Sequence, residues 1–264
     1  MRPTKKLIFA VALFVFATIV SSCREGTIDP DEPDVVQDGF PASELKAVDL
    51  GLSVKWANMN VGAKNELEYG DKYAWGETST KSDFTKDNYK YSKTITYKYK
   101  RSYEEDVYTD SEEVYSKYWT RPVGEGLAAL QYNVECDFAP DMLTTLESSD
   151  DAASKSLGGK WRTPTKEEWE ELFTKCKFSN DVYIDGLTRQ YLLVVTGPNG
   201  NEIVFAVNKS NDLSKDTYQY WSNTLNEKKP EQSILADIQV SSITTGKTKE
   251  YDRFSGLLIR AVQK

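Results

Sequence analysis

The first 46 residues limit the fold most, because neither a leader peptide nor a charged spacer joins a packed core. Three basic side chains among the first six residues precede an apolar run over residues 7–20, and two serines follow it. The run is shorter than the roughly 20 residues of a membrane-spanning helix. A basic start, a short apolar run and small residues are typical of a signal peptide. We therefore expect residues 1–22 to be a signal peptide.

A cysteine lies directly after this segment. Val20-Ser21-Ser22-Cys23 resembles a bacterial lipobox, in which the cysteine becomes the first residue of the mature chain and carries acyl chains such as palmitate. The alternative is an ordinary signal peptide with an incidental cysteine. We expect a lipid anchor at Cys23, and with it a place in the outer membrane, exposed at the cell surface.

Residues 23–46 are rich in acidic side chains and contain three prolines. This composition disfavours a packed element and favours an extended, solvated tether. An acidic segment after a lipidated cysteine also resembles the surface-export signals of Bacteroidetes lipoproteins, and a plain spacer explains it equally well. No Pro/Gly/Ser-rich linker interrupts the rest, so one folded head is expected over residues 47–264.

The ionisable residues exclude several classes of function. Lys and Arg number 33 against 41 Asp and Glu, for a net charge of −8. Such a chain is unsuited to nucleic acid, where affinity comes mainly from phosphate neutralisation. The sequence contains no histidine, which excludes Ser-His-Asp triads, Cys-His pairs and His-ligated zinc or haem. Glycine-rich nucleotide-binding motifs are absent as well. We expect no nucleic-acid partner, no metal and no cofactor.

An apolar stripe at helical spacing predicts a helix over about residues 165–177. The stripe consists of Trp169, Leu172, Phe173 and Cys176. Thr165 and Glu168 form a capping box at its start. A shorter helix is expected over residues 150–157, with the Asp150-Asp151 pair at its N-terminus and Gly158-Gly159 at its end.

Strand signals fill most of the remaining head. Two β-rich runs over 191–196 and 202–207 flank Gly197-Pro-Asn-Gly200 and predict a hairpin. A half-buried strand is predicted over 234–240 and a last strand over 256–262. Residues 89–119 hold eight tyrosines and are interpreted as a long hairpin-like insertion with an exposed tip. The prediction is an α+β fold of mostly antiparallel strands with about two helices.

Several motifs in this order resemble a known family. They are Val48-Asp-Leu-Gly-Leu-Ser-Val-Lys-Trp56, Tyr69-Gly-Asp-Lys-Tyr-Ala-Trp-Gly-Glu77, Gly158-Gly-Lys-Trp-Arg-Thr-Pro-Thr-Lys-Glu-Glu-Trp169, Tyr220-Trp-Ser222 and Ile259-Arg-Ala-Val262. Together they resemble the Fibrobacter succinogenes major paralogous domain, common in Bacteroidetes surface lipoproteins. More distantly, residues 161–169 are similar to the formylglycine-generating sulfatase-modifying family. The resemblance implies a single C-type-lectin-like domain.

Departures from these families limit what the resemblance implies. Family members often have cysteines where this chain has Met59, Ser92 and Trp119. The copper-binding cysteine pair of the sulfatase-modifying enzymes has no counterpart, so their activity is not carried over. Cys136 and Cys176 either pair or remain two buried free thiols, and we favour the free thiols.

Two groups of residues are singled out. Residues of the family-like motifs are expected to be structural, with Arg162 paired to a buried carboxylate such as Glu77: Trp75, Glu77, Trp161, Arg162, Trp169 and Trp221. Aromatic residues of the insertion are expected to contact a ligand: Tyr97, Tyr99, Tyr103 and Trp119. The alternative for each of the tyrosines is that it merely covers the sheet.

The acidic residues are explained without a metal or an acid/base pair. Glutamates at 167, 168, 170 and 171 lie in the first turns of the predicted helix, where they suit its dipole. We therefore expect a non-enzymatic surface lipoprotein that binds a glycan or another surface protein. The alternatives are a structural or adhesin-type component of a surface assembly, and a carboxylate-based enzyme acting on polysaccharide.

Overall fold

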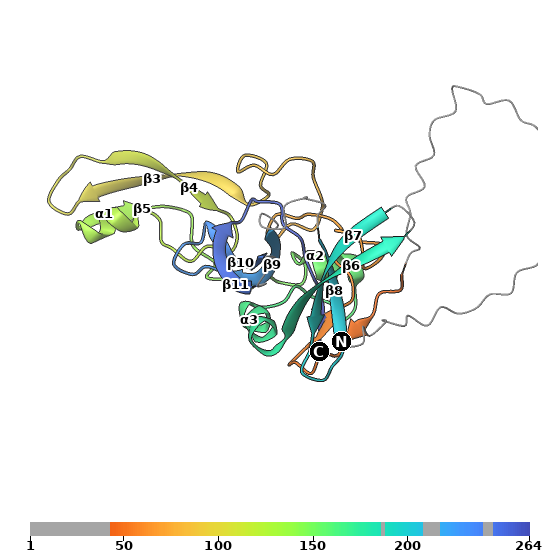
Figure 1. Cartoon of the computed structure of the whole chain (residues 1–264). Helices are drawn as coiled ribbons and strands as arrows, with labels where there is room; N and C mark the ends of the chain where they lie inside the picture. The colour runs from red at the N-terminus through yellow and green to blue at the C-terminus, as the bar shows by residue number, and fades with distance from the viewer. Residues whose placement is uncertain (1–42, 186–187, 208–216, 240–244) are drawn as a thin grey trace, which may run out of the picture. The chain divides into compact units, whose positions relative to one another are not determined.

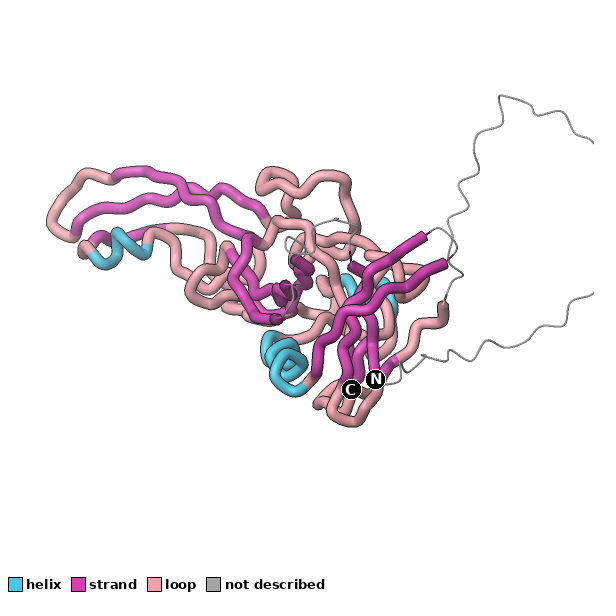
Figure 2. Tube along the Cα trace, viewed as in Figure 1, coloured by secondary structure: helices cyan, strands magenta, loops and turns pink. Residues whose placement is uncertain are grey.

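Four three-stranded antiparallel sheets and three short helices make up the described part of the chain (Figures 1 and 2). The computed structural model describes residues 43–185, 188–207, 217–239 and 245–264. The α+β class with mostly antiparallel strands is confirmed. The predicted signal peptide, Cys23 and nearly all of the tether lie outside the described residues.

The insertion forms a sheet of its own. Its strands are β3 (Ser92–Arg101), β4 (Tyr108–Tyr115) and β5 (Tyr132–Glu135), in the order β4-β3-β5. Helix α1 (Glu125–Ala129) precedes β5, near the end where β3 turns into β4 (Figure 1). The predicted hairpin is thus confirmed, because β3 and β4 pair antiparallel from Ser92↔Tyr115 to Tyr99↔Tyr108.

Three further sheets build the rest of the head. One has the order β11-β10-β9, from β9 (Thr217–Leu225), β10 (Gln232–Gln239) and β11 (Thr245–Asp252). Another has the order β6-β7-β8, from β6 (Lys177–Asp185), β7 (Thr188–Thr196) and β8 (Glu202–Val207), which confirms the predicted hairpin. The last joins both ends of the head, from β1 (Ala47–Val48), β2 (Lys55–Ala57) and β12 (Val262–Gln263).

Both predicted helices are present with their caps. Helix α3 (Lys166–Lys175) has the Thr165–Glu168 capping box, and Cys176 is its C-cap. Helix α2 (Ala152–Leu157) is capped by Asp151, whose carboxylate accepts from the amide of Ala153. No helix among the described residues is long and apolar enough to cross a membrane.

Two strand predictions need correction. The strand predicted over 234–240, whose last residue lies outside the described part of the chain, corresponds to β10. It is not half-buried, because β10 is the central strand and residues 235–238 are all buried. Leu235 packs in one hydrophobic cluster, and Ala236 and Ile238 pack in the other, so both faces of β10 are covered. The segment 256–262, predicted as a strand, is mostly irregular. It forms isolated β-bridges at Leu257 and Leu258 before β12 begins.

Candidate functional site

Two of the four predicted contact residues are buried, which is a correction to the expectation of an exposed aromatic surface. Tyr97 is 7% exposed and Trp119 is 1% exposed. The ring of Tyr97 packs against the loop before α1, so closely that a Cβ atom added at Gly124 would contact it. The Trp119 ring packs edge to face on Tyr115 at 5.9 Å. Both side chains hold the insertion together and have little surface left for a ligand.

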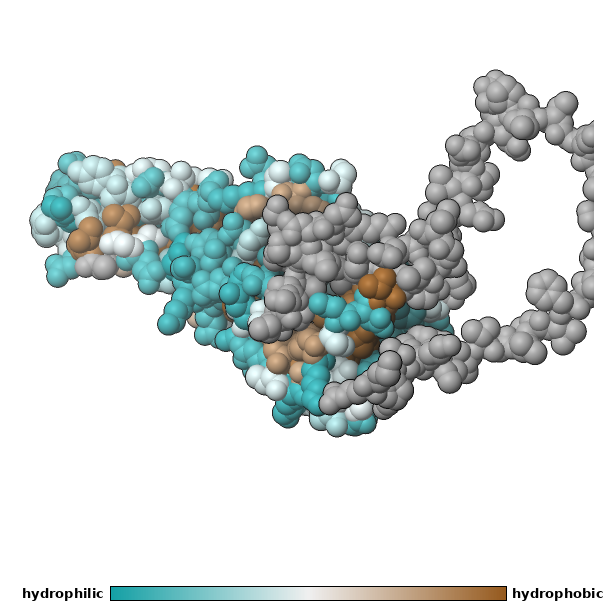
Figure 3. All heavy atoms as spheres, in the orientation of Figure 1, coloured by the Kyte–Doolittle hydropathy of each residue, from teal (hydrophilic) through white to brown (hydrophobic). Residues whose placement is uncertain are grey.

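The other two, Tyr99 and Tyr103, belong to an aromatic surface near the insertion tip. Tyr99 stacks on Tyr108 with ring centroids 5.6 Å apart and planes 24° apart, and it meets Tyr132 edge to face at 5.4 Å. Tyr103 is 77% exposed and Tyr108 is 45% exposed. Close to this surface, Figure 3 shows a small patch of strongly hydrophobic side chains over α1, on an insertion that is otherwise pale to hydrophilic.

Arg101 ties this surface together. Its Nε donates a 2.8 Å hydrogen bond to the hydroxyl of Tyr132, and its guanidinium lies 5.1 Å from that ring's centroid. The same guanidinium lies 6.0 Å from the ring centroid of Tyr103 and pairs with Glu104 at 3.3 Å. We call Tyr99, Arg101, Tyr103, Tyr108 and Tyr132 the tyrosine platform.

Strand register explains why these side chains share one face. Alternate residues of a strand project to the same side, so Tyr97, Tyr99 and Arg101 line one face of β3. The register places Tyr108 opposite Tyr99 and Tyr132 opposite Arg101. Sequence reasoning missed Tyr132, because the short strand β5 carries no pattern that predicts its pairing with β3.

A buried arginine anchors the base of the insertion. Arg253 is 0% exposed, and its guanidinium lies 4.6 Å from the ring centroid of Tyr115 and 4.8 Å from that of Trp75. Its nitrogens donate to the carbonyls of Lys117, Tyr118 and Pro230 and to the hydroxyl of Tyr89. Among the described residues no carboxylate pairs with it, so aromatic rings, carbonyls and the Tyr89 hydroxyl stabilise the charge.

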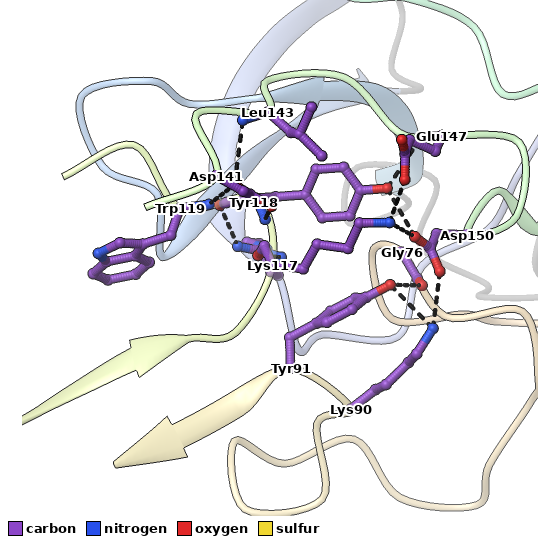
Figure 4. A network of polar contacts seen from close by, with 11 residues as sticks. Gly76, Lys90, Tyr91, Lys117, Tyr118, Trp119, Asp141, Leu143, Glu147 and Asp150 are labelled. Carbon is purple, nitrogen blue, oxygen red and sulfur yellow. Dashed lines mark hydrogen bonds and ion pairs between the residues drawn. The ribbon is translucent and has the colours of Figure 1, made fainter. Parts of the chain in front are cut away.

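A second polar network surrounds Asp150 (Figure 4). The Asp150 carboxylate is buried and accepts from Lys90 Nζ at 2.9 Å, from the Tyr118 hydroxyl at 2.9 Å, and from Lys117. Lys90 precedes β3 and Lys117 follows β4, so one carboxylate holds both ends of the hairpin. Asp150 is therefore not the helix cap that the sequence predicted for the Asp150-Asp151 pair. Asp151 alone caps α2.

The pKa shifts follow from these contacts. Burial alone raises the pKa of Asp150, but the hydrogen bonds from Lys117 and Lys90 outweigh burial and hold it well below its usual range. Burial likewise lowers the pKa of Lys117, yet its hydrogen bonds to Asp150 and Glu147 raise it overall. Burial raises the pKa of Tyr118 to about 12. Asp150 and Lys117 are thus both charged at neutral pH, as a structural ion pair requires.

Tyr118 is held in a strained backbone conformation within this network. Its φ is 57°, in the left-handed region that residues other than glycine rarely adopt. Its amide donates to Asp141, its carbonyl accepts from Arg253 and its hydroxyl donates to Asp150. Such strain persists only where surrounding contacts determine the conformation. The network is therefore a structural anchor for the hairpin.

Most of the predicted structural residues are buried as expected. Trp75, Trp169 and Trp221 are each at most 1% exposed, and Glu77 is 8% exposed, whereas Trp161 is only half-buried. The predicted partner of Arg162 was wrong. Arg162 Nη1 donates to Glu168 at 2.8 Å, and Glu77 instead pairs with Lys81 at 2.9 Å. Glu168 is the nearer carboxylate because it is fixed in the capping box.

The glutamates of α3 are largely committed to structural contacts. Glu168 caps the helix, and Glu170 accepts from Thr248 at 2.8 Å. Glu171 accepts from Ser53 and Lys175; burial raises its pKa, but these hydrogen bonds outweigh burial and lower it. A general acid needs a raised pKa, so Glu171 has the wrong shift for that role. Only part of this cluster is the solvated surface that the sequence predicted.

The two head cysteines are both free thiols. Cys176 is buried at the end of α3, and Cys136 is half-buried just after β5. The expectation of two free thiols is thus confirmed, but only one of them is buried. Within the described ranges, no group of three acidic or cysteine side chains could hold a metal ion.

No family model matches the chain, and no curated protein or solved structure does either.

Proposed function

We propose that this chain is a lipid-anchored surface protein whose head binds a neutral glycan on the tyrosine platform, without chemistry. We also propose membership of the major paralogous domain family with its C-type-lectin-like fold, on the motifs given above. The observation that carries the binding proposal is the stack of Tyr99 and Tyr108 beside Tyr132, with an exposed ring at Tyr103.

The platform offers what a sugar ring needs. Flat aromatic faces remove the apolar side of a sugar from water. Arg101 supplies hydrogen-bond donors, while Glu104 and Asp110 supply acceptors close by. Charges of both signs surround the rings, so hydroxyl groups, which both donate and accept, suit the site better than a strongly charged polymer.

The rigid base of the insertion supports the same proposal. Arg253 and Asp150 hold both ends of the hairpin, so β3 and β4 present the platform from a fixed frame. Binding residues gather on loops and hairpin ends that a rigid scaffold positions. A preorganised platform loses less conformational entropy when a ligand binds.

The test is a glycan array probed with the full chain, followed by titration of the best neutral oligosaccharide. Tyr103→Ser and Tyr108→Ser should each weaken binding by about tenfold or more. Tyr251→Ser, which removes a tyrosine on β11 about as exposed as Tyr108, should not. Unchanged affinity in both platform variants contradicts the proposal. Binding only to acidic glycans contradicts the neutral ligand.

A further inference from the structure

Strand β3 has a free edge beside the base of the insertion. On the β5 side, its ladder covers only Lys98–Arg101, where Lys98 pairs with Glu135. Continuing that register would place Tyr97 opposite Cys136 and Thr94 opposite Ala139. The chain instead leaves the ladder after β5, because Cys136 and Phe138 pack against the hydrophobic cluster beneath the insertion.

A slot of about 520 Å³ lies where the ladder has separated. One wall is β3 over residues 93–96, the other is residues 136–139, and Ser116 adds a hydroxyl. We call this space the β3 slot. The β3 slot lies where the β3–β5 ladder would continue if residues 136–139 paired with β3.

The β3 wall carries backbone groups that pair with no strand in the described part of the chain. In an antiparallel ladder, alternate residues direct N–H and C=O to the same side. The N–H and C=O groups of residues 93–97 that point away from β4 meet no strand, since the pairing of β3 with β5 covers only Lys98–Arg101. On the opposite wall the amide of Phe138 reaches only the Cys136 sulfur, at 3.4 Å. Unpaired strand edges of this kind are templates for another strand.

The charged residues that line the β3 slot indicate which side chains an added strand would need. Lys93 and Asp137 lie on opposite walls, and neither has an ion-pair partner among the described residues; the Lys93 ammonium lies only over the ring of Phe138, at 5.6 Å. The continued register places Asp137 opposite Thr96, three residues from Lys93 and on the other face of β3. An extended segment with an acidic residue and a basic residue three positions apart complements both charges.

We propose that the β3 slot docks an extended peptide segment of a partner protein, which adds as a strand between β3 and residues 136–139. Backbone hydrogen bonds on both sides supply the affinity, and Lys93 and Asp137 select an acidic and a basic side chain. The proposal is independent of the glycan platform.

The probe is the synthetic peptide acetyl-Thr-Glu-Val-Thr-Lys-Thr-amide, added to the full chain at about 1 mM, and the readout is backbone hydrogen exchange by mass spectrometry. The peptide should slow exchange in residues 93–97 and 136–139 and leave α3 unchanged. It should also slow alkylation of the half-buried Cys136. An absence of protection at this concentration overturns the proposal, and so does equal protection by a neutral oligosaccharide.

Two controls test the mode of binding. A peptide of the same sequence with N-methyl groups on alternate residues lacks the ladder donors and should bind at least about tenfold more weakly. Ala139→Trp should fill the slot and abolish protection, whereas Ala128→Trp, at an exposed position on α1, should not. Equal affinity of the N-methylated peptide overturns strand addition. Wild-type binding by Ala139→Trp, with normal exchange in α3, overturns the site.

Discussion

The hydroxyl of Tyr118 donates a 2.9 Å hydrogen bond to the carboxylate of Asp150, and so joins the end of the β3–β4 hairpin to the start of α2. Lys90, just before β3, bonds the same carboxylate at 2.9 Å. One side chain therefore sets where both strands leave the head. Because the tyrosine platform lies farther along the same two strands, its position depends on this buried carboxylate.

Asp150→Asn should destabilise the head by ~2–4 kcal/mol at neutral pH, because it removes the anion between two lysines and leaves Lys117 less well paired. This loss is smaller than the loss expected for a fully buried pair, since half of the Lys90 side chain is exposed. Urea unfolding of the variant and wild type measures the difference. Equal stability contradicts the role of Asp150 as an anchor.

The pH dependence gives a second readout of the same variant. The folded pKa of Asp150 is lowered, so its stabilisation is fully present above the unfolded value of about 3.9 and is lost as pH falls below it. The difference between wild type and Asp150→Asn should stay constant from about pH 7 to pH 5 and shrink below about pH 4. A difference that persists at lower pH indicates that the mutation acts through packing.

Arg253→Lys should cost ~2–4 kcal/mol although it keeps the charge. A lysine cannot supply the fork that reaches the carbonyls of Lys117, Tyr118 and Pro230, and buried carbonyls left without donors are costly. Thermal unfolding measures the loss. Lys247→Arg, at an exposed position on β11, serves as the matched control and should change stability by less than about 0.5 kcal/mol.

The sequence predicts best those elements whose signal is local. The α3 capping box and the 197–200 turn each lie within a few residues, and both were placed correctly. Long-range packing was not predictable in the same way. Tyr97 and Trp119 look like exposed aromatics in an alternating, charged segment, and only the fold shows that Gly124 and Tyr115 cover them.

The anchor and the platform depend on pairings far apart in the chain. Asp150 meets Lys90 across 60 positions, and Arg253 meets Tyr89 across 164. A neighbouring aspartate, Asp151, satisfies the local capping pattern, so the local reasoning had no signal that set Asp150 apart. Tyr132 joins the platform only through the register of β5, which its four residues do not specify.

Trp169→Ala should destabilise the head by ~3–5 kcal/mol, as expected for removing a large core ring. Trp169 is 0% exposed and meets Trp56 edge to face at 4.7 Å. Trp161→Ala, at a half-buried tryptophan, should cost clearly less. Chemical unfolding compares the two. A Trp169→Ala chain as stable as wild type would contradict a structural role for this residue.

Cys23→Ser should release the chain from the membrane fraction and abolish incorporation of labelled palmitate. Acyl chains contribute ~0.8 kcal/mol per buried CH₂, so two or three chains hold a protein firmly. Cys136→Ser is the matched control, since that thiol lies in the folded head. Retention of both label and membrane association by Cys23→Ser contradicts the lipid anchor.

The two head thiols should differ in reactivity when the chain carries Cys23→Ser. Burial raises the pKa of Cys176 to about 11, and the side chain is 9% exposed, so at pH 8 it is protonated and poorly accessible. Cys136 is half-buried at the β3 slot and should react with iodoacetamide in the native state. Mass spectrometry should find one modified cysteine before unfolding and two in urea.

Because the folded pKa of Cys176 is raised, its contribution to stability is complete below the unfolded value of about 8.5 and declines as pH rises toward 11. Native labelling of Cys176 should therefore accelerate above pH 9, and rapid labelling already at pH 8 would show that the end of α3 opens far more readily than its packing implies.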